Sequence, residues 1–153
     1  MSSEIHEGIL ASEETLDEFL HAFFHHTLPK AQWTHAAHVT LAACLLHKAD
    51  VPSVLPIVRN AIRTYNVSVG TQNIDTSGYH ETLTVFWLRV VAQSLGQSPS
   101  ASRLEAVRNV VDAHGVERTL HRLYYSTDIV TCTAASPCPG STSKANNSLR
   151  CIL

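Results

Sequence analysis

The chain has 153 residues, of which 44% are hydrophobic and 16% charged, and its formal net charge is −2 at pH 7. A chain of this length suits one domain that buries about two-thirds of its surface, and a second full domain does not fit. The eleven Lys and Arg residues form no run, so we expect no nucleic-acid partner. The ten histidines nearly equal them in number, which is the unusual feature of the composition.

The sequence also predicts the compartment. Its longest hydrophobic run is too short to span a bilayer, and the start, MSSEIHEGIL, lacks the basic and apolar regions of a signal peptide. The four cysteines show no CxxC spacing, which argues against a disulfide framework and against a cysteine zinc site. We therefore expect a cytoplasmic protein that does not contact a membrane.

Hydrophobic residues recur at helical spacing in six segments, and no segment alternates as a strand does. The first follows Ser12, a common N-cap residue, and its hydrophobic face consists of Leu16, Phe19, Leu20, Phe23 and Phe24. The second runs from about residue 34 to residue 49. The third begins near Ser53, keeps Pro56 in its first turn, and is expected to bury Leu55, Val58, Ile62 and Tyr65.

A loop of thirteen residues, 66–78, is expected before the remaining helices. The fourth helix opens at about Tyr79 and ends before Gly96, the fifth covers residues 103–113, and a short sixth covers residues 120–125. From residue 131 small polar residues without a period replace this pattern. We predict an all-α, compact single-domain bundle of five to six helices over residues 1–130 and a disordered tail over residues 131–153.

The histidines separate by the face on which they lie, since an ideal helix turns 100° per residue. His35 and His38 fall near the middle of the hydrophobic face of the second helix, whereas His47 falls on its far side with Thr40. His80 shares a face with Thr84, Trp87 and Val91 of the fourth helix. The pair His21 and His25 has a suitable spacing for a metal but faces solvent.

Three inward histidines from two helices suggest a metal site. Side chains three residues apart on a helix, such as His35 and His38, lie about 5 to 6 Å apart at Cβ, close enough to bind one ion. His80 would be the third ligand, held neutral by the helix dipole. Glu81 beside it would be a fourth ligand or the general base for a metal-bound water. The alternative is that each imidazole is a hydrogen-bonded core residue.

Aromatic and polar residues near these positions are candidates for the wall of a pocket, although tyrosine at helical spacing is more often simply half-buried. These candidates are Trp33, Tyr65, Asn66, Tyr79, Thr84, Trp87 and Tyr124.

The segments WTHAAHV, TYNVSVG and GYHETLT resemble a group of small, uncharacterised all-helical proteins. Those proteins share a W-x-H-x-x-H segment, an aromatic-Asn-x-x-x-Gly turn and a G-Y-H-E-T segment, and no established reaction is attached to them. The resemblance covers about residues 15–127. If the group shares a site, it implies His35, His38, His80 and Glu81, with Thr84 nearby. After YYSTDIV the chain departs from the continuation that the resemblance implies.

These observations predict a small metal-dependent enzyme that acts on a small organic substrate. With iron or copper the open metal positions would bind substrate and dioxygen, and with zinc the ion would activate water for hydrolysis or elimination. Imidazole suits all three metals, so the identity of the one divalent ion stays open. A non-catalytic protein that binds a metal or small ligand is the alternative, and a purely structural helical domain is a third. The oligomeric state stays open, with a homodimer as one option.

Overall fold

The computed structural model describes residues 7–74, 77–99 and 102–124. These residues are mostly helical, and no strand forms among them beyond one isolated bridge between Ile74 and Ser77. The predicted all-α bundle is therefore confirmed. The tail predicted for residues 131–153 lies outside the described residues.

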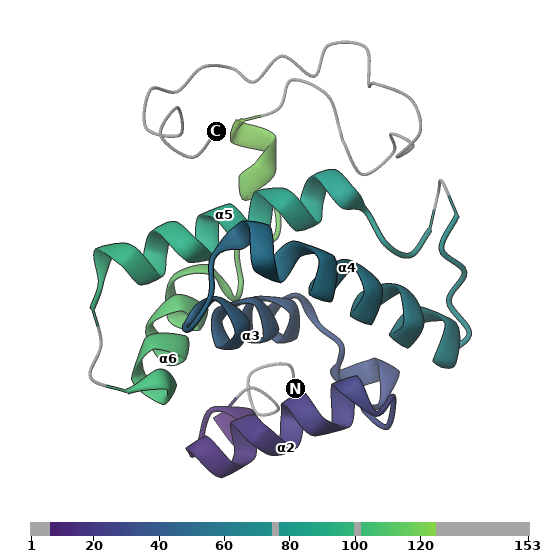
Figure 1. The fold of residues 1–153 in the computed structure, drawn as a ribbon, viewed down its shortest axis with the longest axis horizontal. Helices are drawn as coiled ribbons and strands as arrows, with labels where there is room; N and C mark the ends of the chain where they lie inside the picture. Colours follow the sequence, from purple (N-terminus) through teal and green to yellow (C-terminus); the bar gives the residue numbers. More distant parts are fainter. Residues whose placement is uncertain (1–6, 75–76, 100–101, 125–153) are drawn as a thin grey trace.

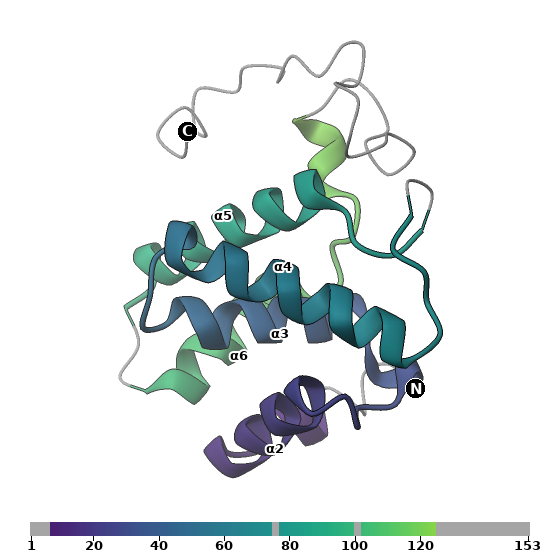
Figure 2. The ribbon, with the colours of Figure 1, turned by 45° about the vertical axis from the view of Figure 1, so that its right-hand side comes forward.

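The helices follow each other with short connections, apart from the loop before α5. In chain order they are α2 (Glu13–Phe24), η1 (Lys30–Gln32), α3 (His35–Leu46), α4 (Val51–Ser68), α5 (Glu81–Gln97), α6 (Arg103–His114) and η2 (Leu120–Leu123). Figures 1 and 2 both show α3 in the middle of the molecule, with α2 and η2 at opposite ends. Among the described residues, no helix is both long enough and apolar enough to cross a membrane.

The central helix α3 is covered by α4, α5 and α6. Its side chains are buried on every side, since small residues such as Ala37 and Ala43 let the neighbouring helices approach closely. The sequence projection placed Thr40 with His47 on the side of this helix opposite its hydrophobic face. In the structure Thr40 is fully buried, and its hydroxyl donates to the carbonyl of Ala36 at 2.8 Å. His47 is partly buried rather than a surface residue. A one-sided hydrophobic stripe is the wrong description of a helix with three neighbours.

The start and end of α4 differ from the prediction. Asp50 caps the helix by accepting from the amide of Ser53 at 3.0 Å, so the helix begins at Val51 and not near Ser53. Pro56 consequently lies inside the helix, beyond its first turn. The helix continues to Ser68, so that the loop before α5 covers residues 69–80 and not 66–78. Both Asp and Ser are good N-caps, and sequence alone did not select between them.

The other predicted elements need smaller corrections. Ser12 does cap α2, in a capping box with Thr15, but Phe24 from its predicted hydrophobic face is 37% exposed. Leu55 is only partly buried, while its neighbour Val54 is buried. The fourth helix begins two residues later than expected and continues past Gly96 to Gln97. The fifth ends at His114, one residue late, and the sixth is a short 3-10 helix.

Tyr65 joins α4 to the segment between α2 and α3. Its side chain is fully buried, and its hydroxyl donates to the carbonyl of Leu28 at 2.9 Å. Its ring packs against those of Phe23 and Trp33, with centroids 5.2 and 5.3 Å away. This cluster fixes Trp33 just before α3 begins.

Replacing Tyr65 with Phe should lower the free energy of unfolding by about 1 to 2 kcal/mol, because the buried carbonyl of Leu28 loses its donor. Urea denaturation measures the change. The control is Thr64→Val on the same helix, which removes an exposed hydroxyl that bonds only within α4. Equal effects of the two substitutions would contradict the role given to the Tyr65 hydroxyl.

Candidate functional site

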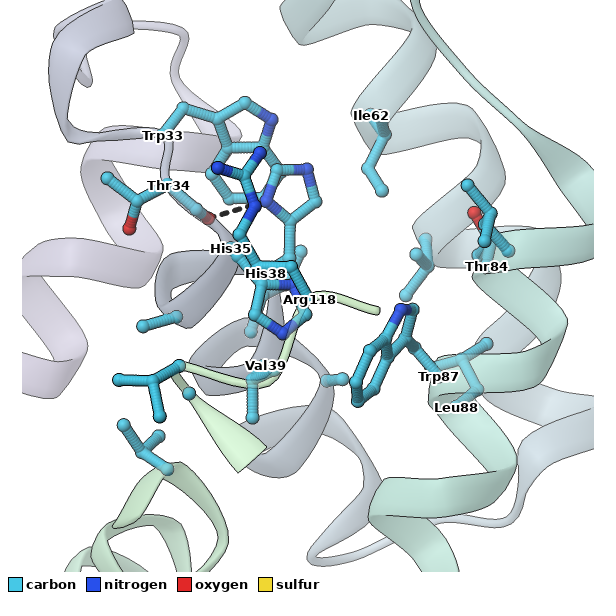
Figure 3. A pocket seen from close by; sticks show the side chains of 18 of the residues that line it. Trp33, Thr34, His35, His38, Val39, Ile62, Thr84, Trp87, Leu88 and Arg118 are labelled. Atoms are coloured by element: carbon cyan, nitrogen blue, oxygen red, sulfur yellow. Dashed lines mark hydrogen bonds between the residues drawn. The ribbon is translucent and has the colours of Figure 1, made fainter. Parts of the chain in front are cut away.

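A pocket of about 1110 Å³ lies between the start of α3, the first turns of α5 and the segment that follows α6. Figure 3 shows Trp33, His35, His38 and Arg118 on one side and Thr84, Trp87 and Leu88 on the other. The apolar part of the lining includes Val39, Leu41, Val58, Ile62, Leu83 and Leu88. All three predicted metal ligands, His35, His38 and His80, line this one pocket.

His38 has a fixed proton position. Its Nδ1 lies 2.6 Å from the carbonyl oxygen of Thr34, the N-cap of α3, and its ring lies against Trp33 with centroids 3.8 Å apart. A carbonyl oxygen only accepts hydrogen bonds, so Nδ1 carries the proton and donates it. In the neutral ring, Nε2 therefore holds a lone pair.

His35 is held in the same way by a different helix. Its Nε2 donates to the carbonyl oxygen of His114, at the end of α6, over 3.1 Å. The neutral ring then has its lone pair on Nδ1. The edge of the ring meets Trp87 of α5, with centroids 4.6 Å apart. His35 thus connects three helices at the wall of the pocket.

Both rings are neutral at pH 7. Burial lowers the pKa of His38 from 6.5 to about 4, and burial also lowers the pKa of His35. The positive charge of Arg118 adds to the lowering at both rings. The pocket therefore presents two adjacent uncharged imidazoles on α3.

The structure places His80 one position before the first residue of α5, whereas the prediction placed it inside the helix. It is the N-cap of α5 and not part of its first turn, and its Nδ1 accepts from the amide of Leu83 at 3.5 Å. A neutral ring that accepts at Nδ1 has its proton on Nε2, so neither nitrogen offers a free lone pair in this conformation. His80 would have to leave the cap before it could bind an ion.

Glu81 is directed away from the pocket. Arg59 of α4 donates to both of its carboxylate oxygens, and the Tyr79 hydroxyl donates to Oε2 at 2.6 Å. The hydrogen bonds from Arg59 lower the pKa of Glu81. A carboxylate held in this way is a weak base, and it does not line the pocket, so the geometry gives no support to its predicted role as ligand or general base.

Four of the predicted wall residues do line the pocket: Trp33, Tyr79, Thr84 and Trp87. The other three have structural roles in the described residues. Tyr65 is in the aromatic core, and Tyr124 packs against Phe86 with ring centroids 5.6 Å apart. The Asn66 amide donates to the side chain of Asn73, which also accepts from the Tyr79 amide, so Asn66 fixes the loop before α5.

Several residues that line the pocket were not predicted from the sequence, among them the charged residues Glu7, Arg108, Asp112 and Arg118 and the buried His121. Arg118 follows α6 in a segment without a helical period, which leaves no pattern to indicate its direction, whereas His121 lies in the predicted sixth helix but was not placed on a face of it. Gly115 starts this segment close to α3, since a Cβ there would lie 2.5 Å from the carbonyl of Val111 and 3.3 Å from the Cβ of Ala36. A glycine directly after a helix was thus the sequence feature that could have indicated this close approach to α3.

Within the described residues, no group of three or more His, Cys, Asp or Glu side chains is arranged to hold a metal ion. The structure brings His35 and His38 together on α3, places His80 elsewhere on the pocket lining, and directs Glu81 toward Arg59. The described residues therefore bring together no complete set of the predicted ligands in this conformation.

Two substitutions of His80 can test whether it stabilises α5 as an N-cap, independently of its imidazole ring. Replacement by Ala should lower the free energy of unfolding by about 1 kcal/mol, because the amide of Leu83 loses its acceptor. Replacement by Asn, itself a good N-cap, should cost much less. Thermal or urea unfolding of both variants is the measurement, and an equal loss in both would argue against capping.

The metal-free protein should become less stable in mild acid because of His38. Above pH 6.5 the ring is neutral in both states; between pH 6.5 and about 4 the unfolded chain binds the proton and the folded protein does not. This ring alone should therefore lower the free energy of unfolding by about 1 kcal/mol between pH 7.5 and 5.5. The free energy of unfolding of the His38→Gln variant should fall by less over this pH range. An identical decline in both proteins would show that His38 is not buried in its neutral form.

In comparisons with family models, curated proteins and solved structures, nothing matches this chain.

Proposed function

We propose that the protein is a small metal-dependent enzyme in which His35 and His38 bind one divalent ion. The observation that carries the proposal is the way both rings are held. Each donates one ring N–H to a backbone carbonyl and has its other nitrogen unprotonated. Metal-binding histidines almost always have such an outer partner, which fixes the tautomer and the ring direction.

The charge state of the two rings favours a metal as well. A proton competes with a metal for the imidazole lone pair, and the lowered pKa values of His35 and His38 remove this competition at pH 7. The rings are three residues apart on α3, a spacing that places both on one face. Imidazole suits iron, zinc and copper, so the proposal includes any of these ions.

A site with two histidine ligands leaves several positions of the ion open. Open positions distinguish catalytic sites from structural ones, because substrate or water must reach the ion. At this site the ion would polarise a bound substrate or activate a bound water. Glu81 is held by Arg59 and Tyr79, so we do not assign it the proton transfer.

Binding of a small organic molecule without a metal is the second candidate. A specific observation favours it: the pocket of about 1110 Å³ is at the upper end of the range for small-molecule sites and far exceeds what an ion needs. Its mostly apolar lining and the indoles of Trp33 and Trp87 suit an organic ligand. The same cavity would hold the substrate if the first candidate is right.

Metal content and titration test the proposal. Protein without an affinity tag, grown with added iron or zinc, should carry about one equivalent of metal. His35→Ala and His38→Ala should each weaken zinc binding at least tenfold in calorimetric titration, because each removes one of two ligands. His25→Ala is the matched control: His25 stacks on His21 on the exposed face of α2 and should not change metal binding.

Two results would reject the metal. One is that no ion is bound after purification and added zinc or iron does not raise the melting temperature. The other is that the His25 variant loses as much affinity as the His38 variant, which would show binding at surface histidines. In either case the small-molecule candidate would stand without the ion.

A further inference from the structure

One cation of the pocket lining, Arg118, lies at the end where the two histidines are. Arg118 lines this end, and Figure 3 places it on the same side as His35 and His38. Among the described residues, its side chain makes no ion pair.

No carboxylate of the described residues forms an ion pair with Arg118. Glu117 lies next to it in the chain, but its Oε1 accepts from the amide and hydroxyl of Thr119, and it does not line the pocket. Glu81 is bound by Arg59. The lining also carries Glu7, Arg108 and Asp112, and among the described residues none of these forms an ion pair with Arg118.

The proposed metal would add positive charge at this end of the pocket. Neutral imidazoles do not reduce the charge of a divalent ion, so the ion and Arg118 together would place three positive charges beside each other. This concentration of positive charge favours an anionic ligand. A guanidinium presents a planar fork that matches a carboxylate or phosphate with two parallel hydrogen bonds.

We infer that the ligand of this pocket is a small organic acid, with its anionic group at Arg118 and an apolar or aromatic body between Trp33 and Trp87. The inference rests on the proposed function only in that the pocket must bind a small molecule. Arg118 sets the preference for an acid, while the apolar side chains of Ile62, Leu83 and Leu88 accommodate the body. The metal, when bound, adds a second contact for the anionic group.

The chain carries its own reporter of binding. It contains two tryptophans, Trp33 and Trp87, and both line the pocket. Intrinsic fluorescence therefore responds to a ligand in this cavity with no background from other tryptophans. Titrations can follow it directly, with and without one equivalent of zinc.

The experiment compares matched probes that differ in charge: phenylacetate with phenylacetamide, octanoate with octanamide, and phenyl phosphate as a second anion. We expect an acid to bind the wild type about tenfold or more tightly than its amide. Arg118→Gln should remove this preference without changing the affinity for the amide, and Arg118→Lys should keep part of it. Arg63→Gln removes the same charge from an exposed position on α4 outside this pocket and should leave the preference intact.

The outcomes separate this inference from the proposed function. Equal binding of acid and amide, or an acid preference that survives in Arg118→Gln, overturns the inference and leaves a pocket that binds neutral molecules. Zinc binding at His35 and His38 without binding of any probe overturns the inference and leaves the metal. Absence of both zinc binding and probe binding overturns the proposed function itself. A stronger response to phenyl phosphate than to phenylacetate would identify the anion as a phosphate.

Discussion

The burial of α3 on all sides is the constraint on which the rest of the structure depends. Most of its residues are small or aliphatic, and three helices pack around them. A polar ring has no place along the middle of such a helix unless a partner satisfies it. The first turn is different, because a helix start offers carbonyl groups and lies at the edge of the core. His35 and His38 occupy this turn, and the pocket opens beside them.

The hydrogen-bond partners of the two histidines are backbone carbonyls rather than carboxylates, and this kind of partner determines the charge state of the rings. The Thr34 oxygen accepts from both the amide and the ring of His38, while the His114 oxygen accepts from His35 at a helix end where intrahelical donors have run out. A carboxylate partner would favour the charged imidazolium, whereas a carbonyl in a desolvated site does so much less. The rings therefore stay neutral. His35 also helps to satisfy the end of α6, so the candidate site and the packing of α6 on α3 share one hydrogen bond.

Local sequence patterns predicted the structural features that depend on residues close together in the chain. Helical spacing located the main helices, and a projection of α3 placed His35 and His38 on one face. Contacts between distant residues were not predictable in this way. Arg59 lies 22 positions before Glu81, and nothing local to GYHET indicates that an arginine of α4 would bind the carboxylate. Arg118 reaches the pocket from a segment without a period, where direction has no sequence signature.

The loop before α5 and the start of α5 are both joined to α4 by hydrogen bonds. Asn73 ties it to Asn66 of α4, and Glu81 with Tyr79 ties the start of α5 to Arg59. These bonds hold the backbone around His80, and its Nδ1 accepts from the Leu83 amide over 3.5 Å. Giving up an N-cap costs about 1 kcal/mol, whereas complete ligand sets bind zinc with about 10 to 16 kcal/mol. The imidazoles of His35 and His38 are not a complete set, and His80 could join them only by giving up this cap.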